Sequence, residues 1–101
     1  VTPKQVNFFG LYDCFPICFI RAVEACGLAK KGEGGRFVEE VYNDYLARKA
    51  IDKKLFPCNT HGGLLAFGAP WEAPSLFSVI EACKQIDGSA NGRQIDNCNV
   101  A

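Results

Sequence analysis

The predicted fold rests on residues 6–26, VNFFGLYDCFPICFIRAVEAC. Val6–Tyr12 is apolar, aromatic and β-branched, which predicts a buried strand or an extended segment. Apolar side chains then recur at helical spacing and predict a helix over Cys14–Cys26, with Asp13 as its N-cap and Gly27 just past its end. These apolar residues are Phe15, Cys18, Phe19, Ala22, Val23 and Cys26. A strand that runs directly into a helix indicates an α/β fold.

The rest of the chain continues this alternation. Helical spacing predicts a second helix over Phe37–Ala50 and a third that begins at Pro74 and Ser75 and ends at Gly88. The buried face of the third helix is predicted to consist of Leu76, Val79, Ile80, Cys83 and Ile86. Leu64–Phe67 is a short apolar run, and Ile95–Ala101 resembles the start of a last strand. Residues 1–101 are therefore predicted to form one α/β domain or part of one.

Composition excludes several classes of protein. The chain has 101 residues, 11 basic against 11 acidic side chains, and 49% hydrophobic residues. Zero net charge argues against nucleic-acid binding, and the apolar content is too high for a disordered chain. No apolar stretch approaches the ~20 residues of a membrane span. The chain contains no Met and no secretory signal pattern, so we interpret Val1 as an internal starting point.

Six cysteines leave two interpretations open. In a small secreted domain they would suggest a disulfide scaffold. No signal segment precedes them, and three of them occupy apolar positions of the helical patterns, where free cysteine packs as a small hydrophobe. We therefore expect six buried, reduced thiols in a cytoplasmic protein. A zinc site is less favoured, because no second Cys/His pair stands near the lone His61 at the usual spacing.

Glycine pairs mark two loops. Gly32-Glu33-Gly34-Gly35 lacks the spacing and the Lys-Ser/Thr pair of a phosphate-binding loop, so an ordinary loop is the preferred interpretation. Gly62-Gly63 predicts backbone with positive φ or backbone that lies against a ligand, and a tight turn into a strand is an equal alternative.

Two polar side chains near these segments are ambiguous. His61 alone is more often a structural histidine than a catalyst. Tyr12 stands at the predicted end of a strand, where a side chain is presented to a cleft. Asp13 is expected to serve only as a helix cap.

Three motifs in this order resemble a known family. They are Tyr12-Asp13-Cys14-Phe15, the loop Gly32–Gly35, and the segment 59–70, NTHGGLLAFGAP. Together they resemble the C-terminal part of the thiolase superfamily, in particular the sterol-carrier/lipid-transfer type, over nearly the whole chain. The resemblance implies a thiolase-like α/β fold, a layered mixed sheet with packed helices, of which residues 1–101 would form a partial C-terminal half.

Two positions depart from the family pattern. Tyr12 stands where the family has the His of His-Asp-Cys-Phe, and Ala69 stands where it has the His of Gly-His-Pro. The same branch contains thiolase-like aldolases that use tyrosines for acid/base work. The resemblance thus implies Tyr12 as the main catalytic residue, with His61 as a second candidate. The substrate-binding residues that it implies are Gly62, Gly63, Phe67 and Gly68.

The implied function is action on acyl-CoA thioesters, by carbon–carbon bond cleavage or formation or by acyl transfer. The alternative is a non-catalytic acyl-binding or scaffolding subunit. The resemblance implies no metal and no cofactor beyond coenzyme A in the substrate. It also implies an N-terminal thiolase half that carries the nucleophilic cysteine, a homodimer, and a small OB-fold/zinc-ribbon partner. Residues 1–101 alone are therefore expected to be inactive.

Overall fold

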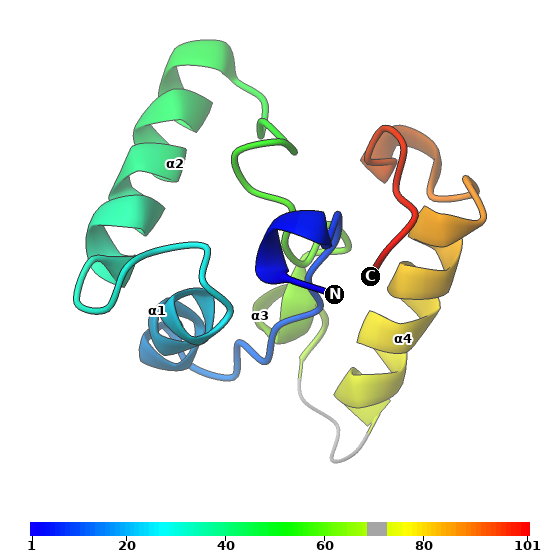
Figure 1. Cartoon of the computed structure of the whole chain (residues 1–101), viewed down its shortest axis with the longest axis horizontal. Helices are drawn as coiled ribbons and strands as arrows, with labels where there is room; N and C mark the ends of the chain where they lie inside the picture. The colour runs from blue at the N-terminus through cyan, green and yellow to red at the C-terminus, as the bar shows by residue number, and fades with distance from the viewer. Residues whose placement is uncertain (69–72) are drawn as a thin grey trace.

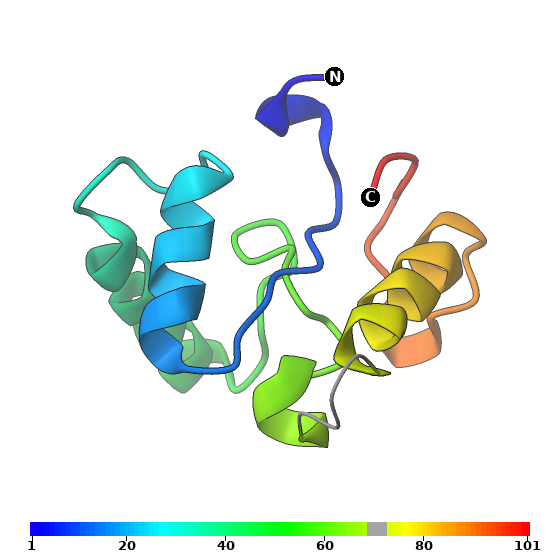
Figure 2. The same cartoon turned by 90° about the horizontal axis from the view of Figure 1, so that it is seen from below.

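A computed structural model describes residues 1–68 and 73–101 of the chain. Its helices are the 3₁₀ turn η1 (Pro3–Gln5), α1 (Pro16–Ala25), α2 (Gly34–Arg48), α3 (Gly63–Phe67), α4 (Ala73–Ile86) and the 3₁₀ turn η2 (Asn91–Arg93). Figures 1 and 2 show α1 and α2 on one side of the molecule and α4 on the other, with the extended segment 6–12 between them. Ala69, at one of the two departures from the family pattern, lies outside the described residues.

Segment 6–12 packs on both of its faces, as a buried strand does. Phe8 forms one hydrophobic cluster with Ile95 and Cys98. Leu11 points to the opposite side and joins a second cluster with Val23 and Cys58. In extended backbone, successive side chains point to opposite faces. The segment therefore separates the α1/α2 side of the molecule from the α4 side.

The predicted sheet is absent from the described part of the chain. Its pairing is limited to one isolated parallel bridge between Phe9 and Cys58. Phe9 N–H donates to the Pro57 carbonyl at 2.8 Å, and Asn59 N–H donates to the Phe9 carbonyl at 3.1 Å. Val6–Tyr12 is thus the extended segment that the sequence allowed as an alternative to a strand, whereas the prediction of a strand at Ile95–Ala101 was wrong.

The side chain of Asn59 explains why the pairing stops. Its backbone has φ 42°, in the left-handed region, so the chain turns away from Leu11 after the bridge. The Asn59 amide then takes the place of the next peptide group. Leu11 N–H donates to Asn59 Oδ1 at 2.8 Å, and Asn59 Nδ2 donates to the Leu11 carbonyl at 2.8 Å. A side-chain amide satisfies the Leu11 backbone groups that a longer ladder would use.

Helix α1 confirms the predicted helix but not its cap. It begins at Pro16, and its N-cap Phe15 has extended backbone and no side-chain capping bond. Proline fits this first helical position because its missing N–H needs no partner there. Val23, on the predicted apolar face, is completely buried. Asp13 does not cap α1, which corrects the sequence-based interpretation.

Helix α2 begins three residues earlier than predicted because Glu24 holds its first turn. The Gly34 N–H donates to Glu24 Oε1 at 2.8 Å. Hydrogen bonds from the backbone of Gly32 and Gly34 lower the pKa of this carboxyl. A Cβ at Gly34 would lie 2.6 Å from the Ile20 carbonyl oxygen. Gly34 is therefore the close contact of α2 with α1, and Gly34 and Gly35 belong to the helix rather than to a loop.

The apolar residues of helix α4 have the predicted spacing, but they face outwards instead of inwards. Its apolar side chains Leu76, Val79, Ile80 and Ile86 are 51% to 62% exposed, and Cys83 is exposed as well. The side chains buried against the rest of the molecule are Glu81 and Gln85. No helix in the described part of the chain is both long and apolar enough to cross a bilayer.

The six cysteines are all free thiols, but they are not all buried. Cys58 and Cys98 are buried, Cys83 is exposed, and the other three are partly exposed. Burial raises the pKa of the Cys58 thiol to about 12 and also raises that of Cys98. These two behave as the packing residues that the sequence predicts. For Cys83 the prediction of burial was wrong.

Candidate functional site

Asp13 joins the two motifs that carry the candidate site. Its side chain is 5% exposed, and Oδ1 accepts a hydrogen bond from the Leu64 N–H at 2.7 Å. Gly63 lies against the same carboxyl group, where a Cβ would overlap the carboxylate. Asp13 therefore satisfies the first turn of α3, a helix distant in sequence, and joins the Tyr12-Asp13 segment to the glycine turn.

Positive φ values are confirmed at both glycines of this turn. Gly62 has φ 106° and Gly63 has φ 66°, and both values favour glycine over any residue with a side chain. The turn leads into α3 and not into a strand, so the tight turn into a strand that the sequence left open does not occur. Gly68 closes the helix with φ 80° and donates its N–H to the Leu64 carbonyl at 2.7 Å.

Tyr12 presents a protonated phenol to the surface. Its side chain is 60% exposed. A hydrogen bond to the Cys14 sulfur is the main cause that raises the pKa of this phenol above 10, and the nearby thiols add to it. A raised pKa keeps the hydroxyl protonated at neutral pH, so Tyr12 is suited to donate a hydrogen bond rather than to remove a proton.

His61 is a neutral, partly buried imidazole. Its ring stacks on Phe67, with ring centroids 5.7 Å apart and an interplanar angle of 24°. Burial lowers its pKa below 6.5, against the opposing effect of the Glu81 and Asp13 carboxylates. Nδ1 is buried and hydrogen-bonds to no group among the described residues. The structure thus brings His61 and Phe67 together, beside the turn that Asp13 holds.

A buried polar network behind the turn was missed by the sequence reasoning. Glu81, only 3% exposed, accepts a hydrogen bond from Thr60 Oγ1 at 2.7 Å. Arg93 donates to both Glu81 oxygens, Nε to Oε1 at 3.1 Å and an Nη to Oε2 at 3.0 Å. Gln85 Nε2 donates to Thr60 Oγ1 at 2.9 Å. This network attaches the segment before Gly62 to α4 and to η2.

The negative charge of Glu81 is stabilised by this network although the side chain is buried. Burial raises the pKa of Glu81, but the hydrogen bonds from Arg93, Thr60 and Gln85 outweigh that effect and lower it overall. The ion pair with Glu81 in turn raises the pKa of Arg93. The spacing of Glu81 and Gln85, four residues apart, does place both side chains on one face of α4. Polar residues opposite an apolar stripe are normally expected to face solvent, so their burial was not predicted.

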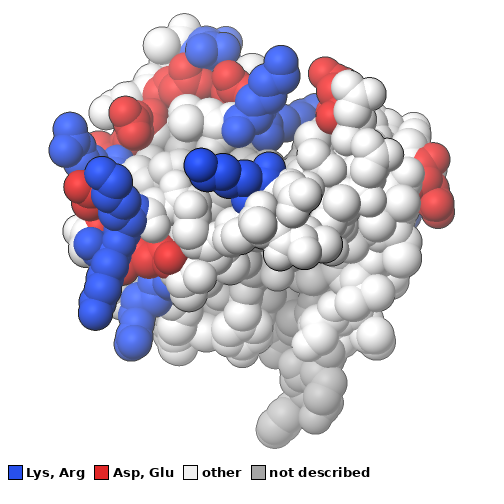
Figure 3. Space-filling model, in the orientation of Figure 1, with Lys and Arg blue, Asp and Glu red and all other residues white. Residues whose placement is uncertain are grey.

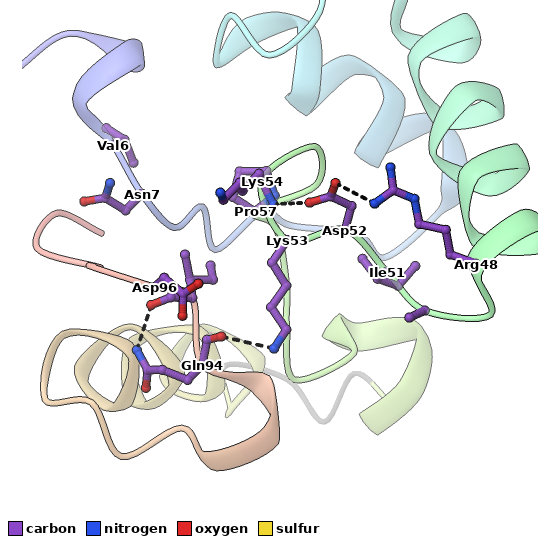
Figure 4. Close-up of a pocket in the computed structure, with 12 residues that line it drawn as sticks. Val6, Asn7, Arg48, Ile51, Asp52, Lys53, Lys54, Pro57, Gln94 and Asp96 are labelled. Atoms are coloured by element: carbon purple, nitrogen blue, oxygen red, sulfur yellow. Dashed lines mark hydrogen bonds and ion pairs between the residues drawn. The ribbon is translucent and has the colours of Figure 1, made fainter.

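Figure 4 shows a charged cavity that none of these network residues lines. It has a volume of about 670 Å³ and is lined in part by Arg48, Asp52 and Lys53. Lys53 Nζ donates to the carbonyls of Gly92 and Gln94 at 2.8 and 3.0 Å, and Arg48 contacts Asp52 at 3.4 Å. Its charges therefore hold neighbouring segments together, and none of the predicted site residues lines it.

Charged side chains are also unevenly distributed over the surface. Figure 3 shows Lys, Arg, Asp and Glu gathered mainly over the α2 side of the molecule. The lower part of the same view, towards α4, is largely uncharged. Among residues 1–68 and 73–101, no three His, Cys, Asp or Glu side chains are placed to hold a metal ion.

The described helices lie on both sides of the central extended segment 6–12, and Asp13 joins this segment to the glycine turn. The chain matches the family described as thiolase C-terminal domain-like over residues 1–101 and belongs to it. The membership predicted from the three motifs is confirmed.

Individual relatives agree with this assignment. The chain is 36% identical to an acetyl-CoA acetyltransferase of Methanothermobacter thermautotrophicus over 99% of its length. It is 33% identical to sterol carrier protein 2 of Bos taurus and to non-specific lipid-transfer protein-like 2 of Caenorhabditis elegans, in both cases over its full length. It spans 24%, 17% and 23% of these three relatives, respectively.

Proposed function

We propose that this chain is the C-terminal part of a thiolase-like enzyme that acts on acyl-CoA thioesters, by carbon–carbon bond cleavage or formation or by acyl transfer. The observation that supports the proposal most is the contact of Asp13 with Gly63 and Leu64, which joins the Tyr12-Asp13 segment to the Gly62-Gly63 turn. The relative named acetyl-CoA acetyltransferase supports the choice of a coenzyme A thioester as substrate.

In this proposal Tyr12 stabilises negative charge on the substrate. Reactions of thioesters pass through an enolate or a tetrahedral oxyanion, and positioned donors that face this oxygen lower the barrier. The protonated phenol of Tyr12 is such a donor. His61, neutral at pH 7, is a weaker second candidate, and Phe67 and Gly68 form the apolar end of the same turn.

The nucleophile of an acyl-transfer reaction would come from elsewhere in the protein. The pKa of Cys18 is raised by its hydrogen bond to Cys14, and burial raises those of Cys58 and Cys98. A raised pKa suppresses the reactive thiolate. This supports the proposal that an N-terminal thiolase half carries the nucleophilic cysteine.

The exposed apolar face of α4 supports the same partner. Leu76, Val79, Ile80 and Ile86 form an unpaired stripe on this helix, and large exposed apolar patches mark interaction sites. We propose that the N-terminal half covers this face. A homodimer, a small OB-fold/zinc-ribbon partner and a cytoplasmic location remain predictions from the resemblance.

A non-catalytic acyl-binding or scaffolding subunit is the second candidate function. It is favoured by the replacement of the histidine of the family motif by Tyr12, a phenol that is 60% exposed and has a raised pKa. Such a group is a poor general base at neutral pH.

Turnover of acyl-CoA substrates by the full-length wild-type protein distinguishes the two, and substitution of Tyr12 tests the role of this residue. Tyr12→Phe removes one oxygen, so the melting temperature should stay unchanged while kcat on acyl-CoA substrates falls by roughly 10²–10⁴-fold. Tyr42→Phe is the matched control, since Tyr42 is exposed to a similar degree on α2. His61→Ala should lower kcat much less. Undiminished turnover by Tyr12→Phe would exclude the catalytic role of Tyr12, whereas the absence of any turnover by the wild-type protein would favour the subunit.

A further inference from the structure

An apolar cavity adjoins the candidate site between α1, α2 and α3. Its volume is about 340 Å³, within the range of pockets that hold small molecules. Most of its lining comes from apolar side chains of three helices and one loop, namely Pro16, Phe19, Ile20, Val38, Phe56 and Leu65. It lies on the α1/α2 side of segment 6–12 and is separate from the exposed stripe of α4.

Polar groups at this cavity already have partners. Asp13 accepts the Leu64 N–H, and the Asn59 amide makes two hydrogen bonds to the Leu11 backbone. These bonds hold both side chains in place, and the six other side chains of the lining are apolar. The chemistry of the cavity therefore selects an apolar occupant.

The cavity also shares residues with the candidate site. Gly62 lines it and belongs to the glycine turn, while Asp13 lines it and directly follows Tyr12. Tyr12 itself is not among the lining residues, so the cavity adjoins the candidate site through Asp13 and Gly62.

We propose that this cavity binds the apolar tail of the acyl group, and that Ile20 and Val38 set the length of chain that fits. The proposal rests on the proposed function, because it takes the thioester to react at Tyr12. Its substrate class is an acyl-CoA with a medium or long aliphatic chain.

The two named residues are suited to control length. Ile20 on α1 and Val38 on α2 are both half-buried and face the cavity from two helices. These helices meet at the Gly34 contact, where the Ile20 carbonyl leaves no room for a side chain. Phe19 and Phe56 pack with ring centroids 5.6 Å apart and support the wall. The width of the cavity is thus set by packed elements.

The test uses Val38→Trp and Ile20→Trp in the full-length protein, assayed with acetyl-CoA, octanoyl-CoA and palmitoyl-CoA. A tryptophan at either position fills the cavity. We expect kcat/KM for the two longer substrates to fall by at least about tenfold and that for acetyl-CoA to change by less than about twofold. Glu39→Trp is the control, because it adds the same side chain at an exposed position of α2 next to Val38.

A smaller change covers the case in which the tryptophan variants fail to fold. Val38→Ala enlarges the cavity and should shift the preference from octanoyl-CoA towards palmitoyl-CoA. An equal loss for all three substrates in a folded tryptophan variant, or an unchanged chain-length preference in Val38→Ala, would overturn the proposal.

Calorimetric binding of octanoyl-CoA, compared with coenzyme A alone, separates this proposal from the proposed function. The wild-type protein could turn over no thioester and still bind octanoyl-CoA more tightly than coenzyme A. If Val38→Trp then removes this difference in affinity, the cavity proposal holds and the enzymatic proposal fails. If the wild-type protein turns over the substrates with no change in Val38→Trp, the cavity proposal alone fails.

Discussion

At the scale of single residues, one carboxylate organises the candidate site. Asp13 was expected to cap the helix that follows it in sequence, and it instead accepts the N–H of Leu64, 51 positions away. Local sequence rules identify a capping residue by its neighbours, and they cannot show which helix it meets after folding. The assignment of Tyr12 to the site is a prediction from the resemblance and does not depend on the cap.

Substitution of Gly63 tests this contact. Gly63→Ala should destabilise the protein by about 1–3 kcal/mol, because φ is positive and the new Cβ overlaps the Asp13 carboxyl group. Gly35→Ala is the matched control, since no atom lies within 4 Å of its added Cβ and alanine favours the helix. Denaturant unfolding measures both variants, and equal midpoints would contradict the packed arrangement of Asp13 and Gly63.

At the scale of elements, the sequence predicted which helices form and how their apolar residues are spaced better than it predicted which face of a helix is buried. Helices α1 and α4 lie where the apolar spacing places them, and both glycines of the 62–63 turn have positive φ. The inward face of α4 was assigned wrongly, because Glu81 and Gln85 are buried by partners that come from Thr60 and Arg93. Long-range partners of this kind leave no periodic signal.

The missing strands have a similar cause. The composition of Val6–Tyr12 correctly predicts buried extended backbone, with Phe8 and Leu11 on opposite faces. Whether extended backbone becomes a strand depends on the neighbouring segment, and here Asn59 turns away after one bridge. The site residues from the resemblance could be located in sequence, but the supporting network of α4 could not.

Acid should weaken the Glu81 network. The folded-state pKa of Glu81 lies below its unfolded value near 4.5, so the stabilisation by its charge is present above pH 4.5 and is lost as the pH falls through the folded pKa. Glu81→Gln should therefore cost about 1–3 kcal/mol at pH 7 and progressively less below pH 4.5. Unfolding curves across this pH range measure the difference from wild type.

Glu39→Gln serves as the control for that series, because Glu39 is exposed on α2. Its unfolding free energy should match wild type at every pH. A constant difference between Glu81→Gln and wild type from neutral to acid pH would show that the charge of Glu81 contributes nothing.

At the scale of the whole molecule, charge and apolar surface occupy different sides. Charged side chains gather over α2 (Figure 3), whereas α4 exposes Leu76, Val79, Ile80 and Ile86. Residues 1–101 expressed alone should therefore self-associate through α4, as apolar patches without a partner do. Sedimentation velocity of the wild-type chain and of Val79→Lys measures this.

Val79→Lys should shift the sedimentation of residues 1–101 towards the monomer, while Tyr42→Lys on the charged side should leave it unchanged. A monodisperse wild-type monomer would contradict the interpretation of the α4 surface as an interface.

The contact between Asp13 and Gly63 also restricts how sequences of this family can diverge. A side chain at position 63 collides with the carboxyl group at position 13, and removal of the carboxyl group leaves the Leu64 N–H without its acceptor. Either change alone is harmful, so the two positions should vary together across an alignment of homologues. Statistical covariation of positions 13 and 63 would then record a contact between two motifs that lie half a chain apart.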